Sequence, residues 1–216
     1  MTDALAPTAA PAVIHVVDDD PAFLRSMLFM VEGLGFAPIG YASAEEFLDA
    51  HPAPAPQGCC VLLDIRMPRM SGLELQRRLA ALGRSLPIVF MTGHGDVDQA
   101  VQAMREGAVD FLQKPFREQA LLDALNHAVD VGLTAQRNLA RRSAAQDLLA
   151  RLSPRERDVA RLLALGLSNK EVARRLEISD HTVHVHRQRI TEKTGSGNAA
   201  DLARLLLRAQ PDGLDE

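Results

Sequence analysis

The sequence has only two cysteines and no long hydrophobic run, and each absence excludes a class of protein. Cys59 and Cys60 are adjacent, which does not suit a disulfide within one strand and lacks the CxxC spacing of a zinc site. No stretch approaches the roughly 18 to 20 apolar residues of a membrane-spanning helix. Residues 1–12, MTDALAPTAAPA, lack the basic start and apolar centre of a signal peptide. We therefore expect a cytoplasmic protein without membrane association, with a disordered N-terminus (1–12) and two buried, reduced cysteines.

Negative charge predominates in the first part of the chain and positive charge in the second. Residues 1–132 contain 9 Lys and Arg against 17 Asp and Glu. Residues 133–216 contain 15 against 11, even though the tail 211–216 is acidic. This asymmetry predicts two domains with different partners, and nucleic acid is the candidate partner of the basic one.

Short apolar runs alternate with helical patterns over the first 132 residues. The runs lie at 13–17, 37–41, 59–63, 87–91 and 109–113, and the helical patterns lie near 21–34, 44–50, 72–83, 97–107 and 117–131. Alternation of this kind predicts an α/β fold, a doubly wound sheet of five parallel strands with helices on both faces. Nearly continuous apolar strands fit a sheet that is covered on both sides.

The second part of the sequence has only helical patterns. Residues 133–150 contain no proline or glycine, which favours a helical linker that continues the fifth helix. Short helical patterns at 154–165, 169–176, 180–193 and 199–209 then predict a small all-helical domain. Ser-x-x-Glu sequences predict capping boxes at four helix starts, Ser43/Glu46, Ser71/Glu74, Ser153/Glu156 and Ser168/Glu171.

Polar side chains stand at the ends of four predicted strands. Asp18 and Asp19 end the first strand, Asp64 the third, Thr92 the fourth and Lys114 the fifth. The carboxyl ends of parallel strands meet at one edge of the sheet, where ligands bind. Three carboxylates close together need a cation, and their hard oxygen atoms favour Mg²⁺. A carboxylate beside Mg²⁺ can act as a nucleophile and form an acyl phosphate, so the residues predict a phosphate-accepting aspartate in a metal site.

Four segments of the first domain resemble the receiver domain of two-component response regulators, most closely the FixJ type: VVDDD, LLDIRMPRMSG, MTGHGD and GAVDFLQKPF. The resemblance covers residues 13–132 and implies a flavodoxin-like sheet with strand order 2-1-3-4-5. It implies that a sensor histidine kinase phosphorylates Asp64. It also implies that Asp19, Asp64 and the Arg66 carbonyl bind Mg²⁺ (or Mn²⁺) directly, whereas Asp18 acts largely through water.

The same resemblance assigns roles in conformational change. Thr92 and Phe111 are expected to reorient together on phosphorylation and to remodel the face formed by the fourth helix, fifth strand and fifth helix. Lys114–Pro115 matches a dipeptide whose peptide bond is usually cis. Arg66 and His94 flank the site and are expected to affect the lifetime of the aspartyl phosphate, whereas Asp20 is expected to cap the first helix.

Residues 168–195 have the spacing of a helix–turn–helix unit, and the segment from 152 to 195 resembles a LuxR-type, four-helix DNA-binding domain over residues 151–210. The resemblance implies that one helix lies in the major groove of promoter DNA. By motif position, it implies base contacts by His184, Val185 and Gln188, and phosphate contacts by Lys170, Thr182, Arg189 and Lys193. A metal site built from His181, His184 and His186 is disfavoured, because no cysteine or clear third ligand accompanies them.

Together the two resemblances imply a transcription regulator rather than an enzyme. Phosphorylation is expected to favour a homodimer, because two-fold symmetry lets two small domains bind a palindrome. RNA polymerase is an expected partner, and the resemblance favours activation over repression. Two alternatives remain open. A phosphatase would need a second aspartate two residues after Asp64, where the sequence has Arg66, and an adaptor would work without phosphorylation.

Overall fold

The computed structural model describes residues 11–50, 58–84, 86–93 and 97–210. His94, residues 1–10 of the predicted N-terminal segment and the acidic tail 211–216 lie outside the described residues. The chain divides into two compact units, Met1–Gln136 and Arg137–Glu216. Within the described ranges, none of the helices combines the length and apolar character that crossing a bilayer requires.

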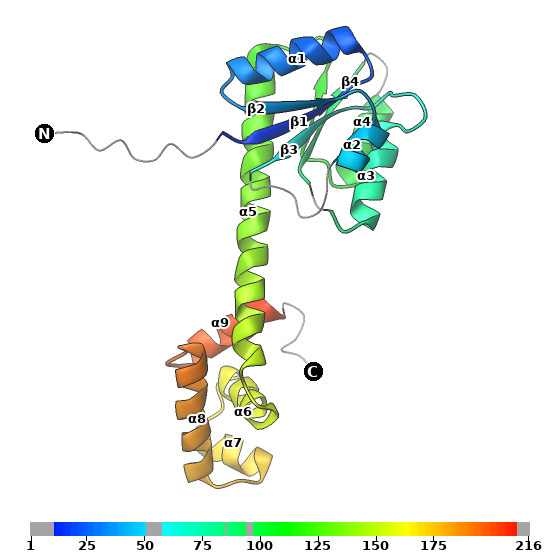
Figure 1. Cartoon of the computed structure of the whole chain (residues 1–216). Coiled ribbons are helices and arrows are strands. Elements are labelled where there is room, and N and C mark those ends of the chain that lie inside the picture. The colour runs from blue at the N-terminus through cyan, green and yellow to red at the C-terminus, as the bar shows by residue number, and fades with distance from the viewer. Residues whose placement is uncertain (1–10, 51–57, 85, 94–96, 211–216) are drawn as a thin grey trace, which may run out of the picture. The chain divides into compact units, whose positions relative to one another are not determined.

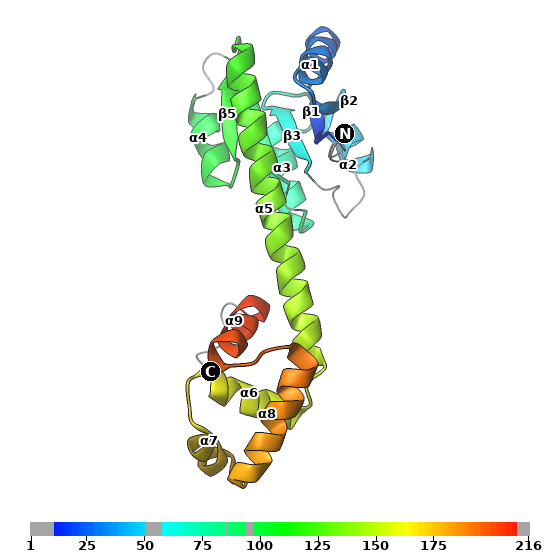
Figure 2. The same cartoon turned by 90° about the vertical axis from the view of Figure 1, so that its left-hand side faces the viewer.

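The first unit contains a sheet of five parallel strands in the order β2-β1-β3-β4-β5, which confirms the predicted fold class (Figure 1; Figure 2). The strands are β1 (Val13–Val17), β2 (Ala37–Tyr41), β3 (Cys60–Asp64), β4 (Ile88–Thr92) and β5 (Asp110–Gln113). Two of them, β3 and β4, lie one residue further along the chain than predicted. The reason is that strand pairing continues to their polar last residues, with Asp64 opposite Met91 and Thr92 opposite Gln113.

Helices cover both faces of this sheet (Figure 1). They are α1 (Pro21–Gly33), α2 (Ala44–Ala50), α3 (Gly72–Ala81), α4 (Val97–Arg105) and α5 (Glu118–Ala150). On one face, Met27 of α1 and Leu121 of α5 belong to the same buried cluster as Leu62 of β3. On the other face, Leu75 of α3 packs in a second cluster with Leu63. Successive β3 residues thus enter opposite layers, and all of them are buried, which explains the unbroken apolar run.

The chain passes so close to β3 at the start of α3 that only glycine fits there. The Gly72 N–H donates to the Ile65 carbonyl oxygen at 2.9 Å. A Cβ atom on Gly72 would lie 2.2 Å from the Asp64 carbonyl oxygen and 3.1 Å from the side chains of Leu63 and Phe90. The obstacle includes backbone, which cannot move aside without displacing the end of β3.

We expect Gly72→Ala to lower the free energy of unfolding by about 2 to 3 kcal/mol, because the added methyl group overpacks the loop between β3 and α3. Urea denaturation of the full chain measures this loss. Gly33→Ala is the matched control, because a Cβ on this helical glycine meets no atom within 4 Å. Equal stability of the two variants would contradict the close approach.

The second unit is built from helices, in agreement with the predicted all-α domain. They are α6 (Pro154–Ala164), α7 (Asn169–Leu176), α8 (Asp180–Thr194) and α9 (Ala199–Ala209). Their shared core includes Val159, Leu163, Val172, Val183, Ile190 and Leu202. The last turns of α5 also belong to this unit, since Ala145 packs with Leu205 and Ala209. The helix is continuous through residues 133–150, as the absence of proline and glycine predicts.

Two of the four predicted capping boxes form completely, at Ser153/Glu156 and Ser168/Glu171. At the other two helix starts the serine hydroxyl accepts from the glutamate N–H, but the glutamate carboxylate bonds elsewhere. Glu74 accepts from Arg78 at 3.1 Å, and Glu46 accepts from the Ala42 N–H at 2.7 Å. The prediction of a complete capping box is therefore wrong at these two helix starts. Each glutamate carboxylate accepts from another donor instead of from the N–H of the capping serine.

Candidate functional site

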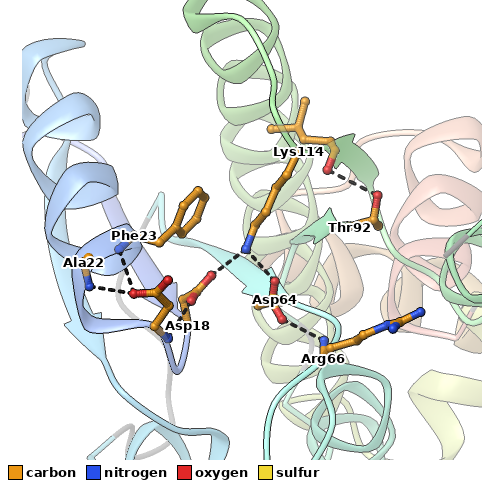
Figure 3. Close-up of polar contacts among 9 residues, drawn as sticks. Asp18, Ala22, Phe23, Asp64, Arg66, Thr92 and Lys114 are labelled. Atoms are coloured by element: carbon orange, nitrogen blue, oxygen red, sulfur yellow. Dashed lines mark hydrogen bonds and ion pairs between the residues drawn. The ribbon is translucent and has the colours of Figure 1, made fainter. Parts of the chain in front are cut away.

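Three of the five polar residues predicted at the strand ends are joined through their side chains (Figure 3). Asp18 follows β1, Asp64 is the last residue of β3 and Lys114 follows β5. The Lys114 Nζ lies 2.7 Å from Asp18 Oδ2 and 2.6 Å from Asp64 Oδ1. One ammonium group thus joins two carboxylates across the carboxyl edge of the sheet.

Both carboxylates are buried and held on their second oxygen by the backbone. Asp18 is 2% exposed, and its Oδ1 accepts from the Asp20 N–H at 2.9 Å. Asp64 is 8% exposed, and its Oδ2 accepts from the Arg66 N–H at 2.7 Å. Removal from water makes these groups depend on the charge of Lys114 and on the N–H donors for their stability.

The three consecutive aspartates lie in different environments. Asp18 is buried, whereas Asp19 is exposed. Asp20 is the N-cap of α1, and its side chain accepts from the N–H groups of Ala22 at 2.8 Å and Phe23 at 3.2 Å. These two backbone bonds lower the pKa of the Asp20 carboxyl. Asp20 therefore caps α1, as predicted.

The fourth strand and the first helix also contact Lys114. Its N–H donates to the Thr92 carbonyl oxygen at 2.7 Å, and its peptide bond to Pro115 is cis. Its Nζ also lies 3.8 Å from the centre of the Phe23 ring, a cation–π contact. Phe23 was not predicted as part of the pocket, because nothing in the local sequence relates it to a lysine more than ninety residues away.

Thr92 and Phe111 lie on the neighbouring strands β4 and β5. Thr92 is 4% exposed, and its hydroxyl donates a long hydrogen bond of 3.5 Å to the Leu112 carbonyl oxygen. Phe111 is 45% exposed, which is unusually high for an aromatic side chain on a strand of this sheet. The joint reorientation of the two side chains stays a prediction.

Burial and charge act in opposite directions on the pKa values of the pocket. Burial raises the pKa of the Asp64 carboxyl, and the hydrogen bond and charge of Lys114 only partly oppose this. For Lys114, burial favours the neutral amine, but the hydrogen bonds to Asp18 and Asp64 prevail and raise its pKa. The pocket thus keeps its lysine charged and places its central carboxylate under electrostatic strain.

The donor atoms of the pocket suit a hard divalent cation. Asp18 and Asp64 present carboxylate oxygens, and the exposed carboxylate of Asp19 is adjacent in sequence. Among the residues that the structure describes, no three His, Cys, Asp or Glu side chains are already gathered closely enough to hold a metal. The single positive charge of the Lys114 ammonium compensates only part of the charge of the two buried carboxylates, and a bound divalent cation would compensate the rest.

The second unit contains the predicted helix–turn–helix. Its first helix, α7, ends at Leu176, and the next residue, Glu177, has a left-handed φ of 54° that turns the chain. The Ser179 side chain then caps α8 by accepting from the Thr182 N–H at 3.0 Å. Val172 of α7 and Val183 of α8 are both fully buried in the same cluster, so the two helices pack through these apolar side chains.

The residues predicted to contact DNA differ in how accessible they are. Four have exposed side chains, namely Lys170, His184, Gln188 and Arg189. Thr182 and Val185 are half-buried, and the Thr182 hydroxyl lies 2.7 Å from that of Ser179. Lys193 differs from all of these, because its Nζ bonds the Glu156 carboxylate at 2.6 Å. The sequence identifies Glu156 as a helix cap but gives no indication of this ion pair.

The Lys193 hydrogen bond lowers the pKa of the Glu156 carboxyl below its ordinary value of 4.5, although burial opposes this. Stability from such a group is present above its unfolded pKa and is lost as the pH falls through its folded pKa. We therefore expect the stability difference between wild type and Glu156→Gln to be largest near neutral pH and to shrink below about pH 4.5. Urea denaturation across this range measures it.

Glu192→Gln is the control for that titration, because Glu192 is exposed and has no ion pair among the described residues. It should differ little from wild type at any pH. A Glu156→Gln difference that stayed constant from pH 7 to pH 3 would contradict the ionic contribution.

Comparisons with known proteins agree with both halves of this architecture. Residues 14–126 match the response regulator receiver domain, and residues 150–206 match the bacterial regulatory proteins of the luxR family. The chain is 42% identical to the transcriptional regulatory protein FixJ of Bradyrhizobium diazoefficiens over 199 residues, which cover 91% of this chain and 95% of that protein. It is 40% identical to the response regulator protein TmoT of Ectopseudomonas mendocina over 198 residues, which cover 91% of this chain and 89% of TmoT.

Solved structures show the same relationship. The response regulator StyR matches with a TM-score of 0.79 and 38% identity, covering 91% of this chain and 98% of StyR. Full-length FixJ from B. japonicum matches with a TM-score of 0.58 and 41% identity, covering 93% of this chain and 98% of FixJ.

The sheet, its acidic edge and the matched region define the first unit as a receiver domain. The chain belongs to the FixJ-like two-component response regulators, with a LuxR-type helix–turn–helix domain that regulates transcription. The family is one of transcription regulators and not of enzymes. A receiver domain implies a histidine kinase as partner, and the helix–turn–helix implies DNA binding.

Proposed function

We propose that the chain accepts a phosphoryl group on Asp64 from a sensor histidine kinase and thereby controls its dimerisation and its binding to promoter DNA. The observation that carries this proposal is the contact of Lys114 with both Asp18 and Asp64 at the carboxyl edge of the sheet. A buried carboxylate beside a fixed cation is oriented for attack and protected from bulk water.

In the reaction, an Asp64 oxygen attacks the phosphorus atom of the kinase phosphohistidine. The P–N bond breaks as the O–P bond forms, and the imidazole nitrogen keeps the electron pair. The Lys114 ammonium and the Thr92 hydroxyl donate to the phosphoryl oxygens. When bound, Mg²⁺ or Mn²⁺ would neutralise charge on these oxygens, held by Asp19, Asp64 and the Arg66 carbonyl, with Asp18 acting through water.

Phosphorylation then changes the surface of the receiver. Within the described residues, the Thr92 hydroxyl has only a long hydrogen bond to Leu112 to give up, and Phe111 on the next strand can turn inward from its exposed position. Their movement remodels the face of α4, β5 and α5 and favours a homodimer, which places two DNA-binding domains on one palindrome. We propose that the bound dimer activates transcription through contact with RNA polymerase.

Incubation with acetyl phosphate and Mg²⁺ tests the phosphoryl transfer directly. The mass of the intact chain should increase by one phosphoryl group, and chelation of the metal should prevent the increase. Size-exclusion chromatography should then show the dimer, and the modified protein should enrich promoter fragments. An unchanged mass would favour an adaptor that works without phosphorylation.

In the DNA-binding domain, we propose base contacts by His184, Val185 and Gln188, and phosphate contacts by Lys170, Thr182 and Arg189. Gln188→Ala should cost about 1 to 3 kcal/mol of binding free energy and relax the preference at one base pair, because an amide can bond an adenine edge on two atoms. Lys170→Met should instead weaken binding to all sequences alike and reduce the salt slope by about 0.9. Titrations of variant DNA duplexes at several salt concentrations separate the two effects.

A further inference from the structure

The first turn of α6 contacts the ends of both helices of the helix–turn–helix. The Arg155 guanidinium donates to the carbonyl oxygen of Leu176, the last residue of α7. The adjacent Glu156 accepts from Lys193, in the last turn of α8, at 2.6 Å. Two consecutive residues therefore tie α7 and α8 to a third helix.

The Glu156 carboxylate is built into the domain rather than placed on its surface. Glu156 is 2% exposed, and its Oε2 accepts both the Lys193 ammonium and the Ser153 N–H, at 2.8 Å. Ser153 and Glu156 also form a complete capping box, so the carboxylate cannot move without disrupting the start of α6. A buried carboxylate that lost its cation would be left uncompensated, which opposes release of Lys193.

This arrangement differs from that of a lysine that awaits a DNA phosphate. Such a lysine should be solvated and unpaired, as Lys170 is, which is exposed and has no ion pair among the described residues. The Lys193 side chain is only 38% exposed, and its charge is already neutralised. The position of the pair also matters, because it fixes the last turn of the helix that carries His184 and Gln188.

We propose that Glu156 and Lys193 act as positioning residues, which hold α8 at the angle required to read bases, and that Lys193 does not serve as a phosphate contact. The proposal rests on the DNA-binding role given above. It gives a new function to a glutamate that the sequence identifies only as a helix cap, and it replaces the phosphate contact expected for Lys193.

A phosphate contact and a positioning role for Lys193 predict opposite changes of DNA affinity for Glu156→Gln. If Lys193 neutralised a phosphate, Glu156→Gln would release it and remove a negative charge, so DNA binding would strengthen, whereas Lys193→Met would weaken it. If the pair positions α8, both Glu156→Gln and Lys193→Met should weaken specific binding, by about 5- to 30-fold. The double variant should be no weaker than the weaker single variant, because the two residues act as one unit.

The experiment uses the phosphorylated full chain and a duplex that the wild type enriches from random-sequence DNA. Affinity for this duplex and for an unrelated duplex is measured at several salt concentrations. The temperature is kept well below the unfolding temperature of each variant, and protein concentrations are corrected for the fraction that is active. We expect the ratio of specific to non-specific affinity to fall in both variants while the salt slope of Lys193→Met stays that of wild type. Lys170→Met is the matched control, and its slope should fall by about 0.9.

Stronger binding by Glu156→Gln, or a slope lowered by about one in Lys193→Met, would overturn the proposal. Hydrogen exchange of the free protein provides a test that needs no DNA: amides in the last turn of α8 should exchange faster in both variants than in wild type or Lys170→Met. Unchanged exchange there would also overturn it. Failure of the wild type to enrich any sequence would refute the DNA-binding role itself, and the exchange data would still decide whether the pair holds α8.

Discussion

Asp64→Asn is expected to abolish phosphorylation by acetyl phosphate and by the kinase, because an amide oxygen is too weak a nucleophile to form the acyl phosphate. The variant should remain folded. The amide is nearly isosteric with the carboxylate, can still accept from the Arg66 N–H, and no longer needs a counter-charge in a buried pocket. The intact mass after incubation with acetyl phosphate measures the loss, and size-exclusion chromatography measures its effect on the dimer.

Asp123→Asn is the control, because Asp123 is an exposed residue of α5 outside the pocket. It should incorporate one phosphoryl group as the wild type does. If Asp64→Asn formed dimers and bound DNA as tightly as the phosphorylated wild type, the coupling between Asp64 and dimerisation would be refuted.

Lys114→Met is expected to produce the largest loss of stability in the pocket, of about 3 to 5 kcal/mol without Mg²⁺. The substitution removes the only cation bonded to Asp18 and Asp64 within the described residues and leaves two buried carboxylates facing one another. Millimolar Mg²⁺ should then stabilise the variant more than it stabilises the wild type, since the ion no longer competes with an ammonium group. Thermal unfolding with and without Mg²⁺ measures both effects.

Two further variants decide whether the loss arises from charge. Lys170→Met makes the same change at an exposed position and should leave the unfolding temperature nearly unchanged. Adding Asp64→Asn to Lys114→Met removes one of the two opposed carboxylates and should recover part of the lost stability. No recovery, together with no added benefit from Mg²⁺, would show that repulsion between the two carboxylates does not cause the loss.

The burial of Asp64 also explains how one pocket can be both stable and reactive. Its carboxylate is desolvated, which raises its pKa, and the hydrogen bond from Lys114, which follows a different strand, partly opposes this rise. Transfer of a phosphoryl group adds negative charge where Lys114 already lies, so a group that stabilises the resting state also stabilises the product. The phosphatase alternative requires an acid at position 66, where the exposed side chain is an arginine.

Much of the fold could be predicted because its signals are local. The alternation of apolar runs with helical patterns and the absence of proline and glycine from 133–150 depend on residues a few positions apart. Strand ends were less predictable. The polar Asp64 and Thr92 look like loop residues in sequence, but hydrogen bonds to neighbouring strands keep them inside β3 and β4.

The sequence by itself determined the two-part architecture and placed Asp18, Asp64 and Lys114 at one edge of a parallel sheet. Only the tertiary structure decided what each charge contacts. Lys114 reaches Asp18 across a separation of 96 residues, and Lys193 reaches Glu156 across 37. Likewise, glycine is needed at position 72 because the start of α3 passes close to the backbone at the end of β3. The physical reason is that periodicity and capping depend on neighbours in the chain, whereas burial and ion pairing depend on residues that only folding brings together.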